Sequence, residues 1–281
     1  MNLSNEKSKK DSFVRIEIHT FIVVFMLSLY GSTHLRAQEY RFERKCSWQE
    51  RFNKRGRVDS NNWNYHIGKF SNEEEFYTDS IGNVFVRNGK LHIVATKDIR
   101  EDKVCSSGRI NTLGKQSFLY GKLDIRAKVP MGKGIFPAIW MLRGDHARVY
   151  PLGEIDIMEY IECFEGKEYS ITTHIVEKQP GLESIRHKHS RNINADMTRF
   201  HIYSLEWTPT YLRFLLDSME VFRLTKEDAE YWPFDVPYYL ILNVAYGNWG
   251  AQCGMDDTIF PREMLVDWIR YYPLKNDLSN L

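Results

Sequence analysis

Short apolar and β-branched runs, separated by turn sequences, make up most of the chain beyond residue 40. Asn88-Gly89, Gly132-Lys133-Gly134 and Asp217-Ser218 are typical of turns between antiparallel strands. Only Thr225–Trp232 indicates a helix, with Thr225 as its N-cap. Many strands without a long helix predict an all-β protein, a sandwich of two antiparallel sheets. The predicted strands are Val84–Arg87, Lys90–Ala95, Gly108–Thr112, Gly121–Val129, Ile135–Met141, Glu154–Tyr160, Ser170–Ile175, His201–Glu206, Tyr211–Leu216, Glu220–Leu224, Tyr238–Ala245 and Val266–Tyr272.

The composition agrees with one globular domain of this class. Of 281 residues, 43% are hydrophobic, which is enough for a large core, and one all-β domain can reach this length. Aromatic residues reach 14%. They fill cores, but they also suit a sugar-binding cleft, because pyranose C–H faces stack on aromatic rings. Without residues 1–37 the chain has 33 basic and 34 acidic residues, and this net charge near −1 does not indicate a nucleic-acid partner and suits a neutral polysaccharide.

Residues 1–37 have the features of a secretory signal peptide. Basic residues precede an apolar run over 21–30, and Ala37 offers a small residue before a cleavage point. The apolar run is short for a bilayer span. We therefore expect one mature domain over 38–281, monomeric and without a membrane span, that is secreted, periplasmic or held at the cell surface. Acidic residues in the leader leave an uncleaved anchor as the alternative.

The four cysteines, Cys46, Cys105, Cys163 and Cys253, are widely spaced and form no Cys-x-x-Cys pair, which argues against metal binding. In an exported protein they allow three full disulfide pairings, and the sequence does not choose among them. Free thiols are the equal alternative.

The run 153–160, GEIDIMEY, places three carboxylates in one predicted strand. Side chains alternate along a strand, so Glu154 and Asp156 share a face. A one-residue bulge at Ile157-Met158 would return Glu159 to that face. Close carboxylates repel as anions, so at least one should keep its proton to higher pH, as a general acid requires. A solvated acidic face is the ordinary alternative for this run taken alone.

Glu154-Ile-Asp156-Ile-Met-Glu159 resembles the signature of glycoside hydrolase family 16, in the bulged form of its laminarinase-like members. Other segments resemble family segments in the family's order, so the resemblance covers about 42–273. They are SGRINT (107–112), YGK (120–122), GIFPAIWML (134–142), EWTP (206–209), WPFD (232–235), LILNVA (240–245), GNWG (247–250), FP (260–261) and MLVDWIRY (264–271). The resemblance implies a β-jelly roll whose concave face forms the substrate cleft.

The resemblance also implies catalytic roles for the three acids. Glu154 would be the nucleophile and Glu159 the general acid/base of a retaining glycosidase, which needs one ionised and one protonated carboxyl group. Asp156, between them, would hold the geometry of the nucleophile and share a proton with it.

Several side chains match sugar-binding positions of the family: Trp140, Trp249, Arg109, His174 and Asn243. The ordinary alternatives are a core position for Trp140, a salt bridge for Arg109 and a satisfied sheet position for His174. A core position is also the alternative for Trp249, but its Gly-Asn-Trp-Gly loop favours a sugar contact.

Other positions depart from the family pattern. Asn72 matches an asparagine that faces a distal sugar subsite, but acids replace two of its neighbours, and a solvated acidic loop is the alternative. Tyr150 and Phe136 stand where many laminarinase-like members have tryptophan, and both are predicted to contact the substrate. The segment 177–190 lacks the Gly-rich loop expected after His174. These departures concern the shape of the subsites and therefore the substrate.

Many members of the family hold a structural calcium ion on the convex side. Asp267 and the backbone of Gly89 match its ligand positions, and oxygen ligands suit calcium. A paired surface acid is the alternative for Asp267. No cofactor is expected for catalysis.

Together these features predict a retaining endo-glycosidase that acts on β-1,3- or mixed β-1,3/1,4-glucans. One rival keeps the chemistry and changes the polymer to a marine galactan such as agar, porphyran or carrageenan. Another is a non-catalytic β-glucan-binding protein, which would be expected to lose a carboxylate; this chain has all three.

Overall fold

The computed structural model describes residues 40–144, 150–163, 167–178 and 183–275, and the predicted signal peptide lies outside these ranges. Nearly all regular structure in the described part is β. The elements are β1 (Trp48–Glu50), β2 (Asn64–Tyr65), β3 (Glu75–Tyr77), β4 (Val84–Arg87), β5 (Lys90–Ala95), β6 (Cys105–Ser107), β7 (Arg109–Asn111), β8 (Gly121–Lys128), β9 (Ile135–Arg143), β10 (Leu152–Glu159), β11 (Glu168–Glu177), β12 (Ile185–Asn194), β13 (His201–Trp207), β14 (Tyr211–Leu216), β15 (Met219–Thr225), β16 (Tyr238–Tyr246), the 3-10 helix η1 (Asn248–Cys253) and β17 (Arg262–Tyr272).

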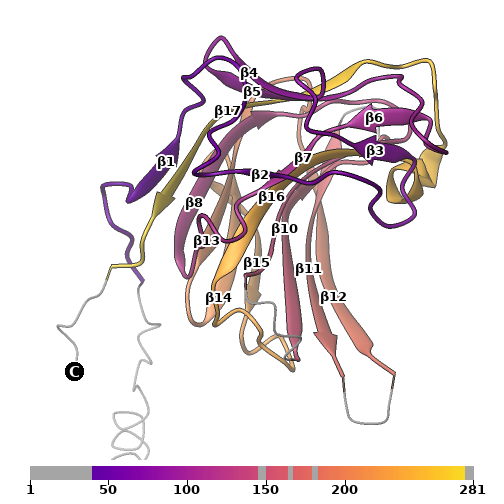
Figure 1. Ribbon diagram of the computed structural model, residues 1–281. Coiled ribbons are helices and arrows are strands. Elements are labelled where there is room, and N and C mark those ends of the chain that lie inside the picture. Colours follow the sequence, from indigo (N-terminus) through magenta and orange to yellow (C-terminus); the bar gives the residue numbers. More distant parts are fainter. Residues whose placement is uncertain (1–39, 145–149, 164–166, 179–182, 276–281) are drawn as a thin grey trace, which may run out of the picture. The chain divides into compact units, whose positions relative to one another are not determined.

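Two large antiparallel sheets form the domain (Figure 1). The first has the order β15-β14-β13-β8-β17-β5-β4, with β1 also paired to β17. The second has the order β12-β11-β10-β9-β16-β7-β2. A small parallel pair, β3 and β6, accompanies them. The prediction of an all-β sandwich is confirmed.

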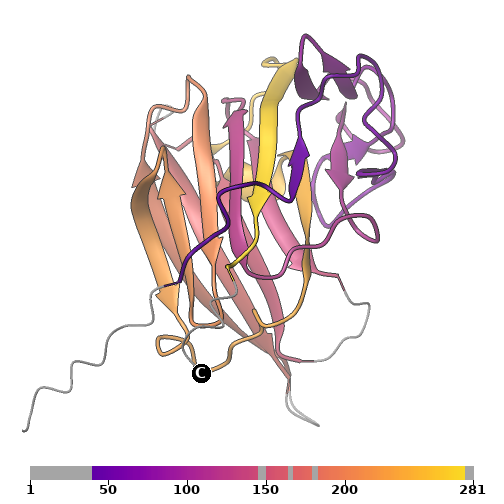
Figure 2. The ribbon, with the colours of Figure 1, turned by 90° about the vertical axis from the view of Figure 1, so that its left-hand side faces the viewer.

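The main core lies between the two large sheets, which Figure 2 shows one in front of the other. Ile155 and Ile157 of β10 are buried in it, together with Leu205 of β13 and Ile125 of β8. Fully burying each such side chain stabilises the fold by about 1.5–3 kcal/mol. Because β10 alternates, this packing leaves Glu154 and Asp156 on the opposite face of the second sheet.

That opposite face carries a separate, small apolar cluster. Ala138 and Trp140 of β9 and Ile241 of β16 form it, with Phe70 and Tyr239 among the side chains packed against them. Trp140 thus lies outside the main core, on the same side of the sheet as the acidic residues.

The helix predicted over Thr225–Trp232 is wrong. β15 continues to Thr225, and a single turn follows, in which the Asp228 N–H donates to the Thr225 hydroxyl and the Thr225 N–H donates to the Asp228 carboxylate. This reciprocal pair is typical of a helix start, but the next residues turn away, and Pro233 follows closely. Within the described residues η1 is the one helix, and no helix there is long and apolar enough to cross a membrane.

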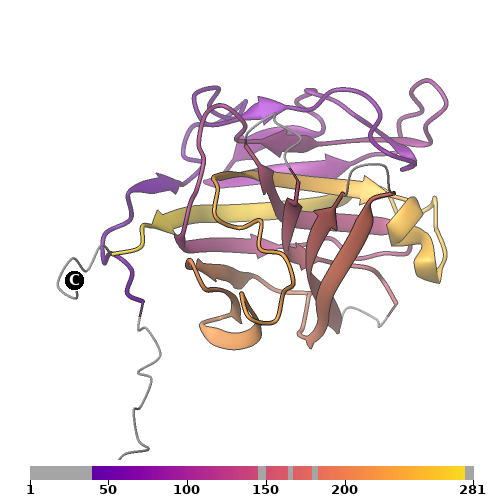
Figure 3. The same ribbon diagram turned by 90° about the horizontal axis from the view of Figure 1, so that it is seen from below.

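One disulfide joins Cys163 to Cys253, while Cys46 and Cys105 are free thiols. The bond ties the chain that follows β10 to η1, which lies beside β9 and β16 (Figure 3). It therefore connects two segments that border the same face of the second sheet.

Candidate active site

The acidic strand β10 contains the predicted bulge. Against β9, Asp156 pairs with Trp140 and Met158 pairs with Ile139, so Ile157 is the extra residue. Ile157 and Met158 are both buried in the core. Two consecutive inward side chains return Glu159 to the face of Glu154 and Asp156.

A cleft of about 510 Å³ lies over this face. All three acids line it, and Asp156 is only 1% exposed. The alternative of a freely solvated acidic face is therefore wrong. Of the residues predicted to bind sugar, the cleft includes Arg109, Phe136, Trp140, His174, Asn243 and Trp249.

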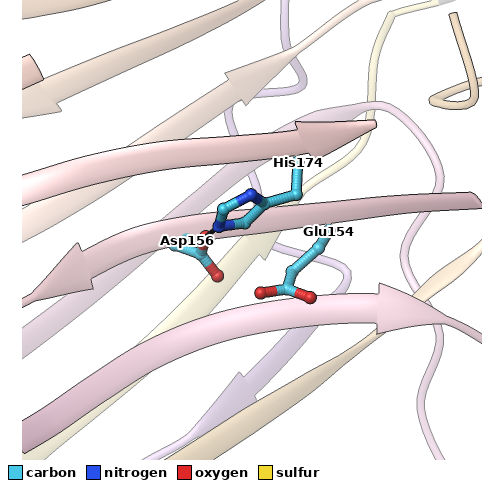
Figure 4. A group of neighbouring side chains, drawn as sticks. All are labelled: Glu154, Asp156 and His174. Atoms are coloured by element: carbon cyan, nitrogen blue, oxygen red, sulfur yellow. Dashed lines mark ion pairs between the residues drawn. The ribbon is translucent and has the colours of Figure 1, made fainter. Parts of the chain in front are cut away.

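Glu154 and Asp156 of β10 lie next to His174 of β11, and their side chains point toward one another (Figure 4). Nε2 of His174 is 3.7 Å from Oδ2 of Asp156. One carboxylate oxygen from each acid and one imidazole nitrogen all lie within 4.8 Å of one another, close enough to share a cation. The positive side chains of Arg186 and Lys188 also line this cleft and oppose that use.

Burial sets the protonation of the acids. It raises the pKa of Glu159 to about 7, against the opposing hydrogen bond from Thr172, with the Glu154 charge adding to the rise. It raises the pKa of Asp156 well above its ordinary value, and the charges of Glu159 and Glu154 add to the effect. Asp156 therefore keeps its proton most strongly, as three close carboxylates require.

Glu154 has a raised pKa as well, mainly from burial, but three groups oppose the rise. Arg186 and Arg109 favour its ionised form, and so does a hydrogen bond with Asp156. Burial, followed by the charges of Arg186 and Lys188, lowers the pKa of His174 to about 4, so the imidazole is neutral at neutral pH. Among the three acids, Glu154 thus has two cations that favour its ionised form, whereas Glu159 keeps its proton to about pH 7 and Asp156 has a strongly raised pKa.

An aromatic wall borders the acids on the β9 and β16 side. The indole N–H of Trp140 donates to Oδ1 of Asn243 at 2.7 Å. The Arg109 guanidinium carbon lies 3.6 Å from the ring centroid of Phe70 and 4.8 Å from that of Trp140. Arg109 is 5% exposed, so its side chain is held in place within this aromatic wall.

Trp249 stands at the rim in η1 and is 60% exposed. Gln252 of the same helix also lines the cleft, and Cys253 anchors this helix through the disulfide. An exposed indole held in place beside a cleft is a suitable platform for a pyranose ring.

Two of the predicted sugar-binding residues lie elsewhere. Asn72 is exposed and Tyr150 is half-buried, and neither belongs to the lining of the cleft. Neighbours of Asn72 do reach it, namely Phe70, Ser71 and Glu73. The segment around Asn72 is also not a solvated acidic loop throughout, because Glu73 and Glu75 are buried.

Sequence reasoning missed Arg186 and Lys188. They lie on β12, a long edge strand whose polar residues give little strand signal. Lys188 pairs with His174 on β11, which places both side chains on the cleft face. The alternating run over 185–194 is the signal in the sequence that could have indicated this strand.

The predicted calcium ligands lie on paired strands. Gly89 is in the turn between β4 and β5, and Asp267 is in β17, which pairs with β5. The Arg126 guanidinium donates to Oδ2 of Asp267. That ion pair is the alternative role given for Asp267, and the calcium site stays a prediction.

Comparisons with known proteins agree with this geometry. The family model "Glycosyl hydrolases family 16" matches residues 71–270. The chain is 37% identical to a β-glucanase of Rhodothermus marinus over 80% of this chain and 84% of that protein. It is 30% identical to a keratan-sulfate endo-1,4-β-galactosidase of Sphingobacterium multivorum over 81% of this chain, but spans only 54% of that relative. The crystal structure of the Rhodothermus marinus laminarinase is similar with a TM-score of 0.74 and 33% identity, covering 84% of this chain and 99% of the other.

Proposed function

The chain belongs to family 16 of the glycosyl hydrolases, and we propose that it cleaves internal bonds of β-1,3- or mixed β-1,3/1,4-glucans with retention of configuration. The observation that carries this proposal is the bulged strand β10, which brings Glu154, Asp156 and Glu159 to one side of a cleft.

In the first step, the Glu154 carboxylate attacks the anomeric carbon while the Glu159 carboxyl group gives its proton to the departing glycosidic oxygen. A covalent glycosyl ester on Glu154 and a free sugar hydroxyl result. In the second step, the Glu159 carboxylate takes a proton from water, the water oxygen bonds to the anomeric carbon, and the ester bond to Glu154 breaks. Both carboxyl groups then regain their starting forms.

The surroundings of each acid support these roles. Glu159 needs its proton at the working pH, and burial raises its pKa to about 7. Glu154 needs to be ionised, and Arg186 and Arg109 favour that form. Asp156 has its proton available for a hydrogen bond to Glu154, which orients the nucleophile.

The aromatic and polar lining supports a polysaccharide substrate. Trp140 and Trp249 offer ring faces, and Arg109 and Asn243 offer groups for hydroxyl recognition. The names of the glucan-degrading relatives favour a β-glucan.

One observation favours a second candidate, the same chemistry on a galactan that carries anionic groups. Arg186 and Lys188 reach the cleft, and positive side chains suit sulfate esters. A relative named for keratan sulfate is consistent with this candidate. The retained carboxylates favour either enzyme over a non-catalytic binding protein.

We also propose that the protein is exported, as its leader indicates, and that catalysis needs no cofactor, because the two carboxyl groups supply both the nucleophile and the proton.

Product analysis after incubation with laminarin, mixed-linkage β-glucan and agarose tests the proposal. Oligosaccharides from a β-glucan are expected, and Glu154→Gln should release none. Glu43→Gln, an exposed site far along the chain from β10, is the matched control and should behave as the wild type. A folded wild-type protein that releases products from agarose alone, or from no polymer, would overturn the glucanase assignment.

A further inference from the structure

A second pair of carboxyl groups lies beside the catalytic acids. Glu73 lines the same cleft and is 7% exposed, while Glu75, at the start of β3, is fully buried behind it. Neither side chain takes part in the two chemical steps.

Hydrogen bonds connect Glu73 to the aromatic wall of the cleft. The Tyr77 hydroxyl donates to Oε2 of Glu73 at 3.3 Å and accepts from Nδ2 of Asn243 at 3.2 Å. Asn243 in turn accepts from the Trp140 indole. A continuous chain of hydrogen bonds therefore runs from Glu73 to Trp140 in the aromatic wall, next to the catalytic strand β10.

Glu75 has one satisfied and one unsatisfied oxygen. Oε2 accepts the backbone N–H of Tyr246 at 2.7 Å. Among the described residues no donor reaches the buried Oε1. The two buried glutamates influence each other's pKa, and two neighbouring buried carboxyl groups do not readily ionise together, so one of them keeps a proton.

The proton belongs on Glu75, the more deeply buried of the two. Burial and the charge of Glu73 raise the pKa of Glu75 well above its ordinary value. Burial also raises the pKa of Glu73, but interactions with Glu75, Arg109, Tyr77 and Lys103 oppose that rise and favour its ionised form. A protonated Glu75 can therefore donate to an ionised Glu73, which lines the cleft.

We propose that Glu73 binds a sugar hydroxyl in the cleft, and that Glu75 is a positioning residue that holds the proton shared by the pair. An ionised carboxylate accepts a hydroxyl hydrogen bond about twice as strongly as a neutral acceptor does. The proposal rests on the proposed function, since it takes the ligand to be the glucan chain.

The shared proton makes sugar binding depend on pH. When Glu75 loses its proton, two buried carboxylates face each other and Glu73 is pushed from its position. The charged and titratable groups that act on the pair are Lys103 in the adjoining loop, Tyr77 of β3, Cys105 of β6 and Arg109 of β7.

Three matched variants test the proposal: Glu73→Gln, Glu75→Gln and the control Glu74→Gln, whose side chain does not line the cleft. Glu73→Gln is expected to raise KM for β-1,3-gluco-oligosaccharides by roughly tenfold to a hundredfold, with a smaller change in kcat. Glu74→Gln should leave both unchanged.

Glu75→Gln supplies a permanent N–H donor of the same size. At neutral pH it should keep the wild-type KM, and the alkaline rise in KM seen with the wild type should disappear. The alkaline fall in kcat, which reports Glu159, should remain in both proteins. If Glu75 had only a structural role, Glu75→Gln would change the melting temperature, and the alkaline rise in KM would remain as in the wild type.

Unchanged KM in folded Glu73→Gln would overturn its sugar-binding role, and an unchanged alkaline KM profile in Glu75→Gln would overturn the shared proton. The Glu75→Gln profile decides the second point even if Glu73→Gln folds poorly. Calorimetric binding of the oligosaccharides to Glu154→Gln, with and without Glu73→Gln, separates this inference from the proposed function. A wild-type protein that hydrolyses no β-glucan would refute the function instead.

Discussion

Nε2 of His174 lies 3.7 Å from Oδ2 of Asp156, and burial favours the uncharged form of both groups, because it raises the pKa of Asp156 and lowers the pKa of His174 to about 4. A protonated Asp156 can donate to Glu154, and an amide can take over that role. We therefore expect Asp156→Asn to lower kcat by only about tenfold to a hundredfold, the range of one or two hydrogen bonds to a charged group. Asp156→Ala, which lacks a hydrogen-bond donor, should lower kcat further. Steady-state kinetics compares them, and equal losses would show that the donor is irrelevant.

The pH profile follows from the two catalytic glutamates. Glu159 acts in its protonated form with a pKa of about 7, so kcat should fall as pH rises through about 7. Glu154 acts in its ionised form with a raised pKa, so activity should appear only above the ordinary range of a glutamate. A plot of kcat against pH from 4 to 10 should be bell-shaped. Constant activity up to pH 9 would exclude Glu159 as the acid.

Arg186 is expected to set the acidic side of that bell. Its charge favours ionised Glu154, so Arg186→Gln should raise the pKa of Glu154 and move the acidic limb to higher pH. The alkaline limb should stay, because Lys188 is the cation that acts on Glu159. Arg191→Gln, on the same strand but the opposite face, is the control. A shift of both the acidic and the alkaline limb in Arg186→Gln would contradict these separate roles of Arg186 and Lys188.

The bulge in β10 makes a prediction about deletions. Removing Met158 alone should straighten the strand and leave Glu159 on the face of Asp156, because side chains two apart share a face. Loss of this buried side chain should lower the free energy of unfolding by about 2–5 kcal/mol, yet hydrolysis should remain measurable. Removing Ile157 as well should turn Glu159 into the core and abolish activity. A folded single-deletion variant as inactive as the double one would refute the bulge argument.

The disulfide is expected to support both the fold and the rim of the cleft. It closes a loop of 90 residues in sequence separation, so Cys253→Ser should lower the free energy of unfolding by about 2–5 kcal/mol. KM should also rise, because η1 carries Trp249. Denaturant melts and kinetics measure the two effects. Cys46→Ser, which removes a free thiol, is the control and should change neither.

Much of the fold could be predicted because hydrophobic alternation and turn residues act locally. Most predicted strands, from Val84–Arg87 to the strand at Val266–Tyr272, have counterparts in the structure. β12 was missed because an edge strand of polar residues lacks a buried face to reveal it. The helix at Thr225–Trp232 was wrong because a good N-cap does not ensure that a helix continues.

The residues of the active site also fall into those that local sequence reveals and those that only the tertiary structure reveals. The motif of β10 identifies its acids by spacing within one strand. Glu73 and Arg186 could not be found by spacing, because they reach the cleft from segments distant in sequence. Three adjacent glutamates over 73–75 look solvated in sequence, and only tertiary packing shows that two are buried.

The anomeric configuration of the first product, followed by proton NMR during hydrolysis of laminarin, tests the central claim most directly. Double displacement through Glu154 predicts that the β-anomer appears first and the α-anomer only later, by mutarotation. Glu154→Gln should give neither. An α-anomer that appears first would mean direct attack by water and would contradict the role of Glu154 as nucleophile.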